Sequence, residues 1–143
     1  MTIERSDYLL TFVGLPGGDY GLDRIRLMKG MFLLTQEGPT TVRHLYSFKP
    51  YDWGPFSAEV YRDLELLGDA GWIAATGAQP YEAYYVTDSG RGRQDDARSA
   101  LGDVLLEKLT ELKRLTTSLS FLDLLEWVYE RHPEYAARSK LQR

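Results

Sequence analysis

The chain contains no cysteine, only two histidines and no long hydrophobic run among its 143 residues. Without cysteine, it forms neither a disulfide nor a thiolate metal site. No segment approaches the roughly 18 apolar residues of a membrane-spanning helix, and the N-terminal sequence MTIERSDYLL lacks the apolar region of a signal peptide. These absences predict a cytoplasmic protein that makes no membrane contact.

Motifs of catalysis and ligand binding are equally scarce. The two histidines, His44 and His132, are not part of a His-Glu-x-x-His motif. The sequence also contains no calcium-loop and no nucleophile-elbow motif. The run GRGR at residues 90–93 lacks the spacing of a phosphate-binding or dinucleotide-binding loop. Acidic pairs such as Asp95-Asp96 have no histidine or metal partner, which makes them weak acid–base candidates. The sequence predicts a protein that is not an enzyme, with no catalytic residue, metal site or cofactor.

Positive charge is in deficit as well. The 17 Lys and Arg residues face 21 Asp and Glu residues, for a formal net charge of -4. Strong binding to nucleic acid would therefore depend on a local basic patch. A hydrophobic content of 43% with 13% aromatic residues predicts a folded globular chain.

Residues 51–73, YDWGPFSAEVYRDLELLGDAGWI, carry the signals of a turn, a helix and the start of a strand. The sequence DWGP favours a turn, and Ser57 is a suitable N-cap for a helix that follows. Phe56 and Tyr61 have the spacing of a hydrophobic staple. Gly68 or Gly71 can end the helix. Helical periodicity predicts a buried face made of Val60, Leu64 and Leu67.

Other elements follow from periodicity and from glycine and proline breaks. Residues 40–54 are read either as an extended piece or as a short helix at 42–48. Strands are expected within 72–77 and 81–90, as a hairpin. Helices are expected at 6–14 with Ser6 as cap, at 22–36, at about 90–119, and at 121–131 with Ser120 as cap.

The order of these elements predicts an α+β fold, with a winged helix-turn-helix core at 1–90 and a C-terminal helical extension at 91–143. Leu64 and Leu67 followed by Gly71-Trp72-Ile73 resemble the end of the recognition helix in PadR-like and MarR-like regulators. The sequence YVTDSGR at residues 85–91 resembles the phrase that closes the wing in those families.

A resemblance to the YwgA-like family covers most of residues 22–140. It rests on LDRIRLMKGMFLL, YDWGPFSAEVYRDLELL and SFLDLLEWVYERHPEYAARSK. The family has a KLQKLLFLL-type helix, from which this chain departs at residues 27–32, and a YGPFS segment in which Trp53 stands here for the tyrosine. That family is distantly similar to SocA-like (Panacea) antitoxin domains. The resemblance implies a winged-helix-like module in a group that includes antitoxins.

The first functional hypothesis is a DNA-binding or transcriptional regulatory module that contacts double-stranded DNA through the helix at 57–70 and the hairpin at 74–86. Glu59, Asp63 and Glu65 oppose it, because acidic side chains repel phosphates. The alternative for its basic side chains is an ordinary solvated helix surface. The candidate DNA-binding residues are Arg24, Arg26, Lys29, Arg43, Lys49, Ser57, Arg62, Arg91 and Arg93.

The second hypothesis is a protein-interaction module, such as an antitoxin that binds a toxin, or an adaptor, without DNA binding. Its candidate contact residues are Trp53, Phe56 and Glu59, since large aromatic side chains dominate protein interfaces. The alternative is that the aromatic cluster packs the turn against the second helix. The hairpin tyrosines Tyr81, Tyr84 and Tyr85 form either a stacking platform for single strands or an ordinary strand surface.

Leucines in the region 101–119 follow a heptad-like spacing that Lys108 interrupts. A helix with such a seam after the wing commonly forms the dimer in PadR-like and MarR-like proteins, so the resemblance implies a homodimer through 101–119. The open alternative is that the leucines fold back as intramolecular core.

Overall fold

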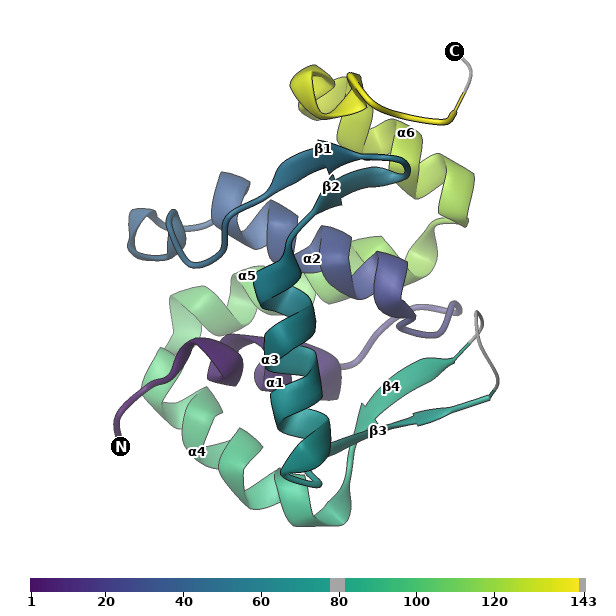
Figure 1. Ribbon diagram of the computed structural model, residues 1–143. Coiled ribbons are helices and arrows are strands. Elements are labelled where there is room, and N and C mark those ends of the chain that lie inside the picture. The colour runs from purple at the N-terminus through teal and green to yellow at the C-terminus, as the bar shows by residue number, and fades with distance from the viewer. Residues whose placement is uncertain (78–81, 142–143) are drawn as a thin grey trace.

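The computed structural model describes residues 1–77 and 82–141 (Figure 1). The helices are α1 (Arg5–Gly14), α2 (Arg24–Glu37), α3 (Ala58–Asp69), α4 (Arg91–Leu101), α5 (Asp103–Ser118) and α6 (Phe121–Arg131). Short 3-10 turns are η1 (Thr40–Val42), η2 (Asp88–Gly90) and η3 (Pro133–Ala136). The strands form two antiparallel hairpins, β1 (Lys49–Tyr51) with β2 (Gly54–Phe56), and β3 (Ile73–Thr76) with β4 (Ala83–Val86). The expected α+β class is confirmed, and the chain is mostly helical.

The central helix α3 begins and ends as its sequence predicts. The Ser57 hydroxyl accepts a hydrogen bond from the Val60 N–H, and the Phe56 and Tyr61 rings contact each other at a centroid distance of 5.4 Å. Gly71 follows the helix with a φ of +78°, a conformation that glycine adopts without strain. Val60, Leu64 and Leu67 are buried.

The cap of α1 differs from the prediction. The helix begins at Arg5, and Glu4 is its N-cap. Glu4 and Asp7 exchange side-chain and backbone hydrogen bonds in a capping box, in which the Glu4 N–H donates to Asp7 at 2.8 Å. The prediction that Ser6 caps this helix is therefore wrong, since a carboxylate pair satisfies the first N–H groups instead.

Residues 40–56 resolve into η1 followed by the β1–β2 hairpin. Lys49 pairs with Phe56 and Tyr51 with Gly54, so the expected turn lies at Asp52 and Trp53. This hairpin stands between α2 and α3, which are therefore not joined by the short turn of a helix-turn-helix. In Figure 1 it lies beside α6, at the end of the molecule away from the β3–β4 hairpin.

The long helix expected at about 90–119 is broken at Gly102. Gly102 has a φ of +87°, which separates α4 from α5 and turns α5 back across α2 (Figure 1). Leu109 and Leu112 are buried, and Leu105 and Leu115 pack against the same core. The leucine seam thus contributes to the core of a single chain. The homodimer through 101–119 stays a prediction.

One hydrophobic core joins both halves of the sequence. It contains residues of α1, α2, α3 and the β3–β4 hairpin together with residues of α5 and α6. The Lys113 ammonium of α5 binds three main-chain oxygens at the end of α1, those of Phe12, Val13 and Leu15, at 3.2, 2.8 and 2.7 Å. Within the described residues, the helices are too short or too polar to cross a membrane.

Candidate functional site

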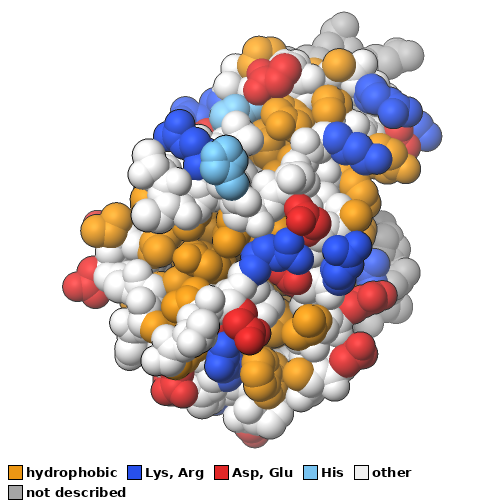
Figure 2. All heavy atoms as spheres, turned by 60° about the vertical axis from the view of Figure 1, so that its left-hand side comes forward, with side chains coloured by type: hydrophobic (Ala, Val, Ile, Leu, Met, Phe, Trp, Pro, Cys, Tyr) orange, Lys and Arg blue, Asp and Glu red, His pale blue; other side chains and the backbone are white. Residues whose placement is uncertain are grey.

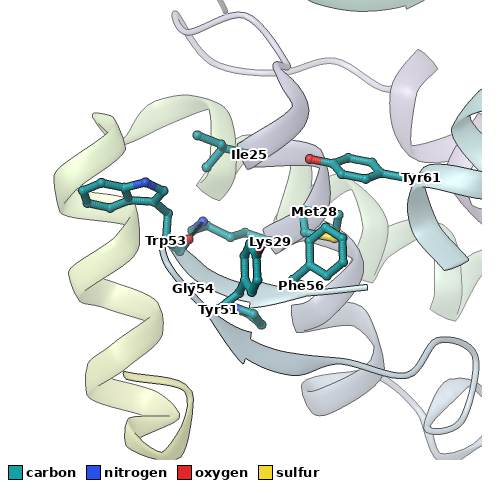
Figure 3. Close-up of a pocket in the computed structure, with 9 residues that line it drawn as sticks. Ile25, Met28, Lys29, Tyr51, Trp53, Gly54, Phe56 and Tyr61 are labelled. Atoms are coloured by element: carbon teal, nitrogen blue, oxygen red, sulfur yellow. Dashed lines mark hydrogen bonds between the residues drawn. The ribbon is translucent and has the colours of Figure 1, made fainter. Parts of the chain in front are cut away.

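An aromatic pocket of about 280 Å³ lies between α2, the β1–β2 hairpin and the first turns of α3 (Figure 3). Ile25 and Met28 of α2 and Pro55 of β2 line it with aliphatic surface. Its aromatic walls are Tyr51, Trp53, Phe56 and Tyr61. The hairpin brings three of these rings to one place because Asp52 and Trp53 form its turn.

Two of the aromatic rings remain open to solvent. Tyr51 and Trp53 are each 43% exposed. The Tyr51 ring lies 5.2 Å from that of Phe56, and the Trp53 ring lies 5.7 Å from that of Phe121 at the start of α6. Phe56 thus packs the hairpin while Trp53 stays exposed, and contact of Trp53 with a partner stays a prediction.

Lys29 reaches from α2 under the hairpin turn toward Trp53 (Figure 3). Its side chain is buried, and the ammonium donates a hydrogen bond of 2.8 Å to the main-chain oxygen of Trp53. Burial lowers the pKa of Lys29 to about 7. The nearby Arg26 adds to this shift, and Asp23 opposes it. No carboxylate of the described residues forms an ion pair with Lys29.

Two further cations, Lys49 and Arg24, lie near aromatic rings that line the pocket without lining it themselves. The Lys49 ammonium lies 5.9 Å from the Tyr51 ring and 6.0 Å from the Phe56 ring, and residues 1–77 and 82–141 offer it no ion-pair partner. The Arg24 guanidinium lies 5.4 Å from the Tyr61 ring. Arg24 also donates to the Tyr84 hydroxyl and pairs with Glu82, contacts that raise its pKa.

The C-terminal segment holds the hairpin from its other side. The Lys140 N–H donates to the main-chain oxygen of Asp52 at 2.8 Å, and the Lys140 ammonium lies 3.4 Å from the Asp52 carboxylate. Tyr135 of η3 packs edge-on against Phe32 of α2. The turn that carries Trp53 is therefore fixed by both helical and C-terminal contacts.

Arg5, which no sequence pattern singles out, partly neutralises the acidic residues of α3. Arg5 donates two hydrogen bonds to Asp63 and one to Glu59. Asp63 is buried and also accepts from the Tyr46 hydroxyl at 2.6 Å. Burial and this hydrogen bond raise the pKa of Tyr46. The candidate contact residue Glu59 thus faces Arg5 and the Ser47 N–H.

Several candidate DNA-binding residues have their polar groups engaged within the chain. Arg26 is buried and donates hydrogen bonds to Asp23 and to the Leu119 oxygen. Lys29 donates to the Trp53 oxygen, and Ser57 caps α3. Arg93 donates two hydrogen bonds to Asp7, at 2.8 and 2.7 Å. Arg91 is exposed and stands 3.4 Å from Asp88. Arg43 and Arg62 are exposed and have no ion-pair partner in the described part of the chain.

Charges of both signs are interspersed on the surface in Figure 2, which brings the N-terminal side of the molecule forward. That face shows no extended area of Lys and Arg alone. Of the hairpin tyrosines, Tyr84 bonds Arg24 and Tyr85 is 45% exposed. Tyr81 and most of the expected hairpin tip lie outside the described residues.

Metal-ligating side chains are not gathered in the described ranges, where no group of three His, Cys, Asp or Glu residues is placed to hold an ion. Comparison of the chain with models of protein families finds no match, and no curated protein matches it either.

Proposed function

We propose that this chain is a non-enzymatic protein-interaction module that receives a large apolar side chain of a partner protein in the aromatic pocket. The observation that carries the proposal is the pairing of a formed pocket with two exposed rings, Tyr51 and Trp53, at its mouth. Exposed aromatic side chains around a pocket are typical anchors of protein interfaces.

The rigidity of the hairpin supports the same function. The turn is fixed by Lys29 on one side and by Lys140 on the other, so little order has to be gained on binding. The resemblance to YwgA-like and SocA-like proteins is in keeping with an antitoxin or adaptor role, in which the partner would be a toxin or a signalling protein.

Co-purification from the native host with an N-terminal tag tests this function. The wild type is expected to capture a defined partner, and Trp53→Ser to lose it. Tyr85→Ser is the matched control, because Tyr85 is 45% exposed and is not a lining residue of the pocket. Equal capture by Trp53→Ser and wild type would overturn the proposal.

DNA binding by a winged helix-turn-helix is the second candidate. It is favoured by the β3–β4 hairpin that directly follows α3, as a wing follows a recognition helix, and by the exposed, unpaired Arg62 on α3. The exposed Glu65 and Asp69 on the same helix weaken it.

A fluorescence anisotropy titration on double-stranded genomic fragments at low salt tests this candidate. Salt-dependent binding that falls in Arg62→Ala would support DNA recognition through α3. Absence of any salt-dependent binding would exclude it.

A further inference from the structure

We infer that the aromatic pocket recognises a carboxylate joined to an apolar group, with Lys29 as the counter-ion. The inference rests on the proposed function and specifies its partner as a protein segment in which an aromatic or aliphatic side chain stands beside an acidic one.

The hydrogen-bonding capacity of Lys29 is the first support. An ammonium group has three N–H donors, and the one acceptor that the described residues offer Lys29 is the Trp53 oxygen. The Phe121 ring lies 5.9 Å from the ammonium. The charged groups that act on it, Asp23 and Arg26, are paired with each other. A buried cation without a counter-ion is unfavourable, so a carboxylate that reaches it gains a strong, charge-assisted partner.

Lys113 provides the contrast within the same chain. It is also a buried lysine, but its ammonium binds three main-chain oxygens and it does not line the aromatic pocket. Its donors are therefore all used in holding α1 to α5. Lys29 lines the pocket with two donors to spare.

Charge around the pocket favours the same ligand. The Lys49 ammonium lies 5.9 Å from the ring of Tyr51, a lining residue, and has no ion-pair partner among the described residues. The neighbouring acids are already paired, Asp23 with Arg26, Asp52 with Lys140 and Glu82 with Arg24. Lys29 is the one charged side chain among the described residues that line the pocket, and a cation there attracts an acidic segment.

The hairpin turn packs closely against Lys29 at Gly54. A Cβ atom at this position would lie 3.2 Å from the Lys29 ammonium nitrogen and 3.2 Å from Leu125. Gly54 also has a φ of +102°, which disfavours any other residue. The backbone of the turn can therefore approach the ammonium closely at Gly54 (Figure 3).

Isothermal titration calorimetry with two matched probes tests the inference. 3-Phenylpropionate carries the carboxylate, and 3-phenylpropanamide has a similar shape without the charge. The acid is expected to bind about tenfold or more tightly than the amide. Lys29→Met should abolish this preference, whereas Lys113→Met should keep it, with circular dichroism to show that both variants fold.

Equal binding of acid and amide to the wild type would overturn the inference, as would an acid preference that persists in Lys29→Met. The proposed function is judged separately by partner capture. If Trp53→Ser loses the partner while the wild type shows no preference for the acid over the amide, the protein-interaction function is supported and the carboxylate site is rejected. If the acid preference depends on Lys29 but partner capture does not depend on Trp53, the carboxylate site is supported and the proposed protein-interaction function is rejected.

Discussion

Arg5 at the start of α1 and Asp63 in the middle of α3 form a two-point ion pair, with hydrogen bonds of 2.8 and 3.0 Å. The Asp63 carboxylate is buried, and Tyr46 donates to it as well. An acid that appears in the sequence as part of a phosphate-repelling helix surface is therefore an internal connection between two helices.

Arg5→Ala is expected to lower the free energy of unfolding by about 2–3 kcal/mol, because it leaves a buried carboxylate without its cation. The figure allows for the partial exposure of Arg5. Urea denaturation measures the change. Arg62→Ala, beside Asp63 on α3, is the control. Its effect should stay within about 0.5 kcal/mol, since Arg62 is exposed and has no ion-pair partner among the described residues. Equal effects of the two substitutions would contradict the role of the Arg5–Asp63 pair.

Lys29 is expected to make the stability rise with pH above neutrality. Its pKa is about 7 in the folded chain against an ordinary value of 10.5, so the unfolded chain binds more protons between these values. The free energy of unfolding therefore increases from about pH 7 to about pH 10, by at most roughly 4 kcal/mol.

Urea midpoints between pH 7 and 10 test this effect in Lys29→Met, which should show a flatter rise than the wild type. Lys113, whose pKa burial lowers to about 8, gives a smaller rise in the same direction and remains in the variant. A variant with an unchanged slope would show that Lys29 is charged in the folded chain throughout this range.

Leu64→Ala should lower the free energy of unfolding by about 2–5 kcal/mol, because it removes buried methyl groups from the core. Leu64 is 7% exposed, whereas Leu66, two residues along the same helix, is 50% exposed. Leu66→Ala is therefore the matched control, with an expected change within about 0.5 kcal/mol. Thermal and urea unfolding of the two variants compare the faces of α3 directly.

Local signals in the sequence predicted the parts of the fold that depend on neighbouring residues. Ser57, the Phe56 and Tyr61 pair, and Gly71 each act within a few positions of α3, and each does what its residue type favours. Trp53 is a candidate contact residue because large aromatic side chains dominate interfaces. It is 43% exposed, and its contact with a partner stays a prediction.

Contacts between distant segments could not be predicted from the sequence. Arg5 meets Asp63 across 58 positions and Lys29 meets Trp53 across 24, and no periodicity links such pairs. Lys29 lies in a helix among other basic residues, so it was grouped with them as a DNA contact, although its side chain faces inward. The sequence KPYDWGPF shows too little alternation to have indicated the β1–β2 hairpin.

Gly102 allows α5 to pack into the core of its own chain, where an unbroken helix would favour exchange of α5 between two chains. Alanine there would oppose the φ of +87° and favour one continuous helix from α4 into α5. A continuous helix would move α5 away from α1 and α2 and expose their core residues. The α5 helix of a second copy would then cover these residues in a domain-swapped dimer. Light scattering during size-exclusion chromatography should accordingly detect a dimer for Gly102→Ala and a smaller species for Gly92→Ala, whose added Cβ lies within a regular helix and meets no atom within 4 Å.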